Sequence, residues 1–191
     1  MQLTILAIGK DVASLKVFDQ DHIGDAELTL LANLKNEPLS TIANRYLLNS
    51  REVFCLCHNN AWFGPGSLEI FVNTAMEGKM CGIVGRSMTL EYCWCHSNPA
   101  KVSTLDGCSL FFPVKYNLRF DDKTFNGLHC HVEDLCLQGQ KLGMEIVVPT
   151  ANAAHKDAGH TPSENEAWQR DYWRYRAILA NKWKGTTFHT T

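Results

Sequence analysis

Residues 52–60, EVFCLCHNN, place a short apolar run directly before three polar side chains. The run predicts a buried strand, because it is apolar throughout, short, and rich in residues that favour strands. In an open α/β sheet, ligands collect beyond the carboxyl ends of the strands. We therefore expect His58, Asn59 and Asn60 to lie at a sheet edge where a ligand can bind.

Strand and helix patterns alternate on both sides of this run. Helical spacing of apolar residues, N-cap candidates at Ser40 and Ser67, and a terminating Gly143 mark the helices. The alternation predicts one α/β domain with a mixed, mainly parallel sheet. The expected strands are 2–8, 26–33 (which also fits a helix), 52–57, 81–85, 105–113 and 144–148, and the expected helices are 39–49, 68–76, 131–142 and 164–184.

Length and charge limit the classes of function. The chain has 191 residues, which fits one domain with a sizeable core. Its formal net charge is −2, whereas a broad nucleic-acid surface needs an excess of Lys and Arg. We therefore expect no nucleic-acid partner, and any anionic ligand must be bound by a few locally placed groups.

The amino-terminal sequence MQLTILAIGKD has no basic segment of the kind that begins a signal peptide. No apolar run reaches the roughly 18 residues that span a bilayer. These features predict a cytoplasmic protein without a transmembrane segment.

The eight cysteines are expected to be reduced thiols that pack as small hydrophobic side chains. Two C-x-C pairs, each followed by His58 or His96, leave a zinc-stabilised interaction domain as an alternative. Their spacing differs from the usual C-x2-4-C of structural zinc sites. The cysteines are Cys55, Cys57, Cys81, Cys93, Cys95, Cys108, Cys130 and Cys136.

Polar side chains also occur near two other expected elements. His155 follows the strand over 144–148, and Glu133 with Asp134 lies near the start of the helix over 131–142. We expect His58–Asn60, Asp134 and His155 to converge at one edge of the sheet.

Two long segments carry a resemblance to family 2-type glycosyltransferases with a GT-A fold. LSTIANRYLLNSREVFCLCHNNAWFGPGSLE resembles the core in which a helix containing Asn precedes a strand ending in a D-x-D-like or H-x-D-like motif. LDGCSLFFP, followed by LRFDDKTFNGLHCHVEDLCLQGQKLGMEIVVP, resembles the second half of that family. The similarity spans roughly residues 28–160 and is greatest to the sub-group with an H-x-D metal motif, related to the glycosyltransferases named for a streptomycin-biosynthesis protein.

The resemblance implies a three-layer fold that binds a nucleotide-sugar. Residues 1–60 would form the nucleotide-binding half, 61–160 the acceptor and catalytic half, and 161–191 a carboxyl-terminal helix. It implies Mn²⁺ or Mg²⁺ as cofactor, and transfer of a hexose-type sugar, with UDP as the expected nucleotide, to an unknown acceptor with inversion. The oligomeric state is left open.

The same resemblance gives each matched residue a role. His58, Asn60 and His155 would hold the metal, and Asp134 with Glu133 would supply the general base. The residues implied at the nucleotide are Ile8, Gly9, Asn33, Asn44 and Asn59, and those at the sugar or acceptor are Asp106, Gly107 and His131.

The chain also departs from the family pattern. Asn60 stands where the metal motif usually ends in Asp, which removes a charge and weakens metal affinity. Ala32 and Asn33 stand where the second strand usually ends in Asp. A non-catalytic nucleotide- or sugar-binding module on the same fold is therefore the alternative function.

Structural roles also fit these residues. Asn59 and Asn60 suit a turn, and Glu133 and Asp134 complement a helix dipole. His155 fits an ordinary surface histidine, while His129 and His131 fit either the acceptor pocket or packing. The aromatic residues of the last helix are expected to form a packing face.

Overall fold

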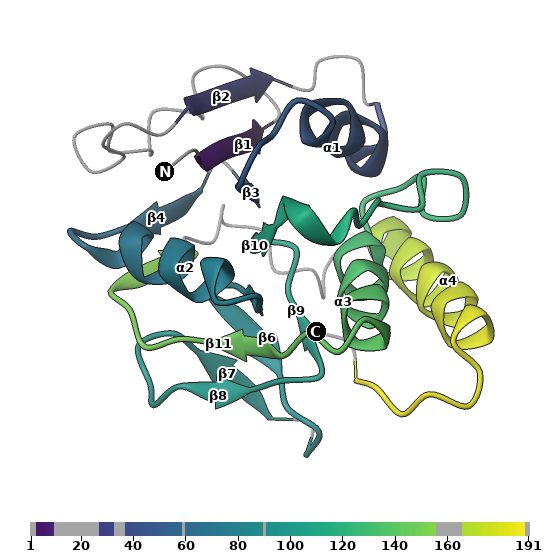
Figure 1. Cartoon of the computed structure of the whole chain (residues 1–191). Coiled ribbons are helices and arrows are strands. Elements are labelled where there is room, and N and C mark those ends of the chain that lie inside the picture. Colours follow the sequence, from purple (N-terminus) through teal and green to yellow (C-terminus); the bar gives the residue numbers. More distant parts are fainter. Residues whose placement is uncertain are drawn as a thin grey trace.

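The computed structural model describes residues 3–9, 27–32, 37–58, 60–89, 91–155 and 166–189 (Figure 1). Its centre is a seven-stranded sheet with the strand order β2-β1-β3-β10-β5-β11-β8. In chain order, the strands of this sheet are β1 Leu3–Gly9, β2 Glu27–Ala32, β3 Val53–His58, β5 Met80–Cys81, β8 Ala100–Lys101, β10 Ser109–Pro113 and β11 Ile146–Val148.

The direction of the strands confirms the mixed, mainly parallel sheet. β1 pairs in parallel with β2 and β3, and β5 pairs in parallel with β11. β10 is antiparallel to both β3 and β5, and β8 is antiparallel to β11. Five strands therefore run one way and two run the other. The carboxyl ends of β1 and β3 meet, because Ile8 is paired with His58.

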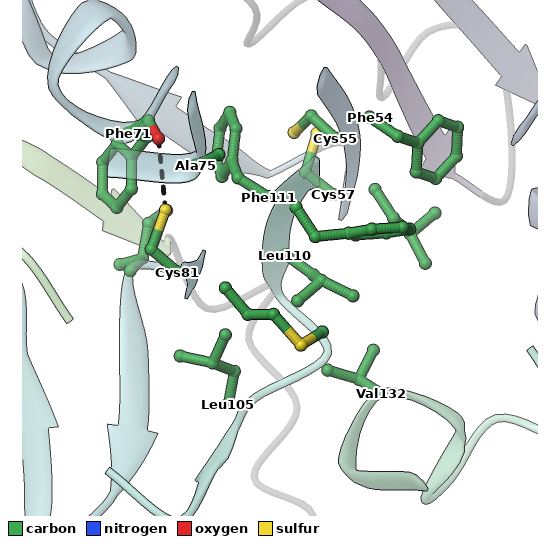
Figure 2. Close-up of a cluster of buried hydrophobic side chains, with 14 of the residues drawn as sticks. Phe54, Cys55, Cys57, Phe71, Ala75, Cys81, Leu105, Leu110, Phe111 and Val132 are labelled. Atoms are coloured by element: carbon green, nitrogen blue, oxygen red, sulfur yellow. Dashed lines mark hydrogen bonds between the residues drawn. The ribbon is translucent and has the colours of Figure 1, made fainter. Parts of the chain in front are cut away.

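Helix α2, Ser67–Met76, covers one face of this sheet. Phe111 of β10 is paired with Cys55 on one side and Cys81 on the other, so the three side chains share a face. Phe71 of α2 stacks on Phe111, with ring centroids 5.0 Å apart. Figure 2 shows this contact, together with the hydrogen bond of 3.2 Å from the Cys81 thiol to the Phe71 carbonyl.

Helix α1, Leu39–Leu47, and the segment that leads to α3 lie on the opposite face. Phe54 and Phe112 point to this face, and the Phe120 ring packs edge-on against Phe112 with centroids 6.4 Å apart. The Asn44 side chain of α1 holds the Phe120 backbone at both ends. Its Nδ2 donates to the Phe120 carbonyl at 2.8 Å, and its Oδ1 accepts from the Phe120 N–H at 2.9 Å. The result is three layers, with α2 on one side of the sheet and α1 on the other.

The carboxyl-terminal helices α3, His131–Lys141, and α4, Glu166–Lys182, lie side by side (Figure 1). Buried side chains from both helices and from the segment before α3 form a second small core. The members of this core are Phe125, Cys130, Leu137, Tyr175, Leu179 and Trp183. The expected packing face of the last helix is therefore confirmed for its buried aromatic residues, whereas Trp173 is 58% exposed.

Two small sheets complete the fold. β4 Ala61–Phe63 pairs with β12 Ala153–His155, and β6 Val84–Arg86 lies between β7 Tyr92–Trp94 and β9 Thr104–Leu105. The single strand predicted over 81–85 is wrong, since β5 and β6 belong to different sheets. Residues 153–155, for which no strand was predicted, form β12. A short 3-10 helix, Val114–Tyr116, follows β10.

The serine N-caps are also wrong. Helix α1 has Pro38 at its N-cap, and the Ser40 hydroxyl instead donates a hydrogen bond of 2.7 Å to the Phe125 carbonyl. Helix α2 has Gly66 at its N-cap with φ +73°, and the Ser67 hydroxyl donates to the Asn152 carbonyl at 2.9 Å. Both serines tie their helices to distant segments rather than capping them.

The thiols pack as expected. Seven of the eight are buried, Cys93 is half-buried, and all eight are free. Burial raises the pKa of Cys55, Cys81 and Cys108 well above that of an exposed thiol. Cys55, Cys57 and Cys81 lie among the apolar side chains of the core in Figure 2. The Cys55, Cys81 and Cys108 thiols are therefore protonated and behave as small hydrophobic side chains.

Candidate functional site

His58 and His155 meet at the carboxyl end of β3, although they lie 97 residues apart in the chain. β3 ends at His58, and β4 begins three residues later. β12 pairs antiparallel with β4, with His155 opposite Ala61, so this pairing returns His155 to the end of β3. The His58 Nδ1 and His155 Nε2 atoms lie 3.3 Å apart, and the ring centroids 5.4 Å apart.

This pair of imidazoles is chemically suited to a divalent cation. Burial lowers the pKa of His58, and the neighbouring His155 lowers it further, while Asp106 opposes the shift. His58 is therefore neutral at pH 7 and has a lone pair to offer. Two nitrogens bound to one ion at about 2.1 Å lie about 3.0–3.4 Å apart for bond angles between 90° and 109°. The observed separation of 3.3 Å falls within that interval.

Asp106 and Gly107 lie beside His58 in the turn between β9 and β10. The Asp106 carboxylate accepts a hydrogen bond of 2.8 Å from the Cys108 N–H, and the His58 N–H donates to the Cys108 carbonyl at 3.0 Å. A Cβ at Gly107 would lie 4.0 Å from His58 Nε2 and 4.0 Å from a methyl group of Val132. The turn therefore brings the predicted sugar-side residues next to the predicted metal ligand.

His131, the first residue of α3, lies near the same turn. It is 3% exposed, and neither of its ring nitrogens has a hydrogen-bond partner in the part of the chain that the structure describes. Burial lowers its pKa to about 3, with smaller contributions from His58 and His129 that Asp106 opposes. The Phe120 ring lies 6.0 Å away, centroid to centroid. His131 is thus a neutral, buried imidazole whose hydrogen-bonding capacity is unused.

Asp134 is held by α4 and by its own helix. Its carboxylate is completely buried and accepts hydrogen bonds from Trp183 Nε1 at 2.7 Å, Lys182 Nζ at 2.8 Å and Gln138 Nε2 at 2.8 Å. These contacts assign it a structural role at the α3–α4 junction. Glu133, its predicted partner, is buried as well. The assignment of either carboxylate as the general base stays a prediction.

The residues predicted at the nucleotide do not all lie in one place. Ile8 is buried beside His58 in the sheet, and Gly9 ends β1 at the same edge. Asn44 uses its side-chain amide on the Phe120 backbone. Asn33 and Asn59 lie outside the described residues. Asn60, predicted as a metal ligand, is half-buried between β3 and β4.

Two imidazoles are the nitrogen ligands brought together here. Within the described ranges, no group of three or more His, Cys, Asp or Glu side chains is arranged to hold a metal ion. A cation at His58 and His155 would therefore need oxygen atoms from Asn60, from solvent or from a ligand. Of the helices in the described part of the chain, none has the length and apolar character needed to cross a membrane.

Sequence reasoning missed the residues that hold Asp134. Lys182 and Trp183 come from a helix whose aromatic pattern indicated only packing, and Gln138 follows Asp134 by one helical turn. Lys182 also donates to Asp121 at 2.8 Å, and this bond, with one from Thr124, outweighs burial and lowers the pKa of Asp121 to about 2. The i, i+4 spacing of Asp134 and Gln138 is the one signal in the sequence that could have indicated part of this network.

Comparison with known proteins identifies the fold. No family model matches the chain, and no curated protein matches its sequence. Among solved structures, GalNAc-T7 with UDP, GalNAc and Mn²⁺ matches with a TM-score of 0.62 and 7% identity, covering 95% of this chain. The chain spans 48% of that structure's own length. The likeness confirms the GT-A-like fold expected from the sequence.

A second match is weaker. The inositol-1-phosphate CTP transferase from T. maritima aligns over 97% of both chains with 12% identity and a TM-score of 0.39. A likeness of this size carries no argument about this chain.

Proposed function

We propose that this chain binds a nucleotide-sugar, with UDP as the nucleotide, together with Mn²⁺ or Mg²⁺, and transfers the sugar to an acceptor with inversion. The observation that carries the proposal is the 3.3 Å approach of His58 Nδ1 to His155 Nε2 at the edge where β1 and β3 end. Residues 1–60 would form the donor side of this edge and 61–160 the acceptor side. The GT-A-like fold supports the nucleotide-sugar class.

The roles of the residues follow from their positions. His58, His155 and Asn60 would hold the cation, which as a Lewis acid stabilises the charge of a departing diphosphate. Ile8 and Gly9 would border the nucleotide at the end of β1. Asp106 would keep its carboxylate at the sugar, because its hydrogen bond to the Cys108 N–H fixes the turn. Gly107 leaves room beside His58 because it has no side chain.

Inversion requires a base that removes the acceptor proton, an aid typically worth about 10²–10⁴-fold in rate. Asp134 and Glu133 are the carboxylates proposed for this step. The three donors on Asp134 and its complete burial count against direct contact with an acceptor. Turnover of Asp134→Asn and of Glu133→Gln, each compared with its own folding stability, will separate the two.

The cation site is tested by UDP binding with and without Mn²⁺. Because His58 and His155 supply its two nitrogen ligands, His58→Ala and His155→Ala should each weaken Mn²⁺-dependent UDP binding by about 10- to 100-fold. Calorimetry measures the affinity, and the exposed histidine His96, changed to Ala, is the matched control. Equal UDP affinity in the wild type with and without Mn²⁺ would remove the cation from the proposal.

A second candidate function is a binding module without turnover. Asn60 in place of Asp, and an Asp134 carboxylate fully engaged by α3 and α4, favour this alternative. It predicts that UDP binds while no UDP-sugar is hydrolysed or transferred. Measuring UDP release from a panel of UDP-sugars with Mn²⁺ distinguishes the two functions.

A further inference from the structure

We infer that His131 is a specificity residue, whose imidazole hydrogen-bonds a hydroxyl group of the sugar carried by the nucleotide donor. The inference rests on the proposed function and deepens it, because it assigns the recognition of the sugar to a residue that is separate from the cation ligands. It starts from a buried side chain that has no hydrogen bond within the protein.

The missing partners of His131 are the first observation. Both ring nitrogens are buried, and among the described residues neither has a hydrogen-bond partner. Buried polar groups in folded proteins nearly always have a partner, and the exceptions concentrate at sites that bind water, ions or substrates. A neutral imidazole has one donor and one acceptor, which is the complement of a sugar hydroxyl.

The position of His131 is the second observation. His131 lies close enough to His58 and Asp106 for their charges to act on its ionisation. His131 precedes Val132, whose methyl group and His58 Nε2 both lie 4.0 Å from where a Gly107 side chain would begin. The absence of a Gly107 side chain leaves space on the side of the turn that faces His58. In the proposed complex, the sugar attached to a diphosphate at His58 occupies this space.

The backbone before His131 is the third observation. Cys130 has φ +64°, in the left-handed region that non-glycine residues rarely adopt. Such conformations persist where surrounding contacts enforce them, and they are frequent at ligand sites. Here the Asp134 N–H donates to the Cys130 carbonyl at 3.0 Å, so the first turn of α3 fixes this conformation. The Cys130 conformation therefore sets where α3 begins and where His131 is placed.

The experiment compares the affinities of UDP and of UDP-sugars for the wild type, His131→Phe and His131→Leu, with Mn²⁺ present. Because UDP lacks the sugar, its affinity should be the same in all three proteins. The gain in affinity from UDP to the preferred UDP-sugar should fall about tenfold in both variants, as expected for one lost hydrogen bond. The thermal midpoint of His131→Phe should be no lower than that of the wild type, because no hydrogen bond within the protein is lost.

Phe120→Leu is the matched control, since it alters the ring beside His131 without changing a hydrogen-bonding group. It should lower the thermal midpoint and leave the gain from UDP to UDP-sugar unchanged. An unchanged gain in His131→Phe and His131→Leu would overturn the inference while leaving the proposed function intact. If the wild type binds UDP no better with Mn²⁺ and gains nothing from the sugar, the proposed function itself fails.

Discussion

Two polar side chains in the first turn of α3 are both buried, yet their surroundings differ completely. Asp134 faces α4 and accepts three hydrogen bonds, from Trp183, Lys182 and Gln138. His131, three residues earlier, lies near the end of β3, and its ring accepts or donates no hydrogen bond within the described ranges. A buried polar group with all its partners contributes to stability, whereas one without partners costs stability until something binds it. The difference separates the junction that holds the helices from the edge that would hold a ligand.

The largest expected effect comes from removing the Asp134 carboxylate. Asp134→Ala leaves the buried Trp183 Nε1 without its acceptor, while Gln138 keeps the Arg119 carbonyl and Lys182 keeps Asp121. Breaking a buried pair typically costs 3–5 kcal/mol. Lys182 is partly exposed, so we expect a loss of about 3 kcal/mol in the free energy of unfolding, measured by urea denaturation.

Asp134→Asn is the control for this prediction, because it keeps the shape of the side chain and loses only its charge. We expect it to cost about half as much as Asp134→Ala. If Asp134→Ala were as stable as the wild type but had lost turnover, the prediction would be wrong. Asp134 would then serve the reaction rather than the helix junction.

The second effect concerns the dependence of stability on pH. The pKa of His131 is about 3 in the folded protein and about 6.5 in the unfolded chain. Between these values the unfolded chain binds the extra proton, so the wild type loses stability as the pH falls below 6.5. His131→Phe lacks this contribution and should lose about 2 kcal/mol less than the wild type between pH 6.5 and pH 5.

Urea denaturation of both proteins at several pH values measures this difference. Parallel curves for wild type and variant would mean that His131 is solvated, or has a bound partner, in the folded protein. Groups whose charges do not act on His131 contribute equally to both proteins. The subtraction therefore leaves His131 and its coupling to His58, His129 and Asp106.

The smallest expected effect concerns Ser40, a buried polar group with one hydrogen-bond partner. It tests whether the number of partners sets the contribution of such a group to stability. Ser40 is buried and donates one hydrogen bond of 2.7 Å to the Phe125 carbonyl. Ser40→Ala should therefore cost about 1 kcal/mol in the free energy of unfolding. UDP affinity should stay unchanged, because Ser40 lies away from His58 and His155. A cost as large as that of Asp134→Ala would show that the number of partners does not set the effect.

The sequence predicted the long elements because their patterns are local. Apolar runs identified β1 and β3, helical spacing identified α1 to α4, and Gly143, with φ +80°, ends α3 as expected. The short strands β4 and β12 were missed, and β6 was joined to β5 in one predicted strand, because three residues carry too little periodicity to be recognised. They form through pairing with distant segments, which a local pattern does not encode.

The site was predictable where it follows from strand order. His58 follows from the rule that ligands collect at strand ends, whereas Asp106 was expected from the family resemblance alone. In the structure, the charges of both act on His131. The surroundings of Asp134 and Asn44 were not predictable, because their partners lie on α4 and at Phe120, far along the chain. Residue type alone does not reveal whether the side chain of a buried Asp or Asn already forms hydrogen bonds with other groups of the protein.

The pairing of β12 with β4 brings His155, from the late part of the chain, into contact with His58, from the early part. Because the pairing of β12 with β4 holds His155 next to His58, an ion that bridges the two rings would also fasten β12 to the end of β3. Binding of the ion to the two histidines and pairing of β12 with β4 are then thermodynamically linked, so ion binding stabilises the pairing and the pairing raises the affinity for the ion. A fragment that stops before β12 would keep most of the central sheet but would lack His155, and with it the histidine pair.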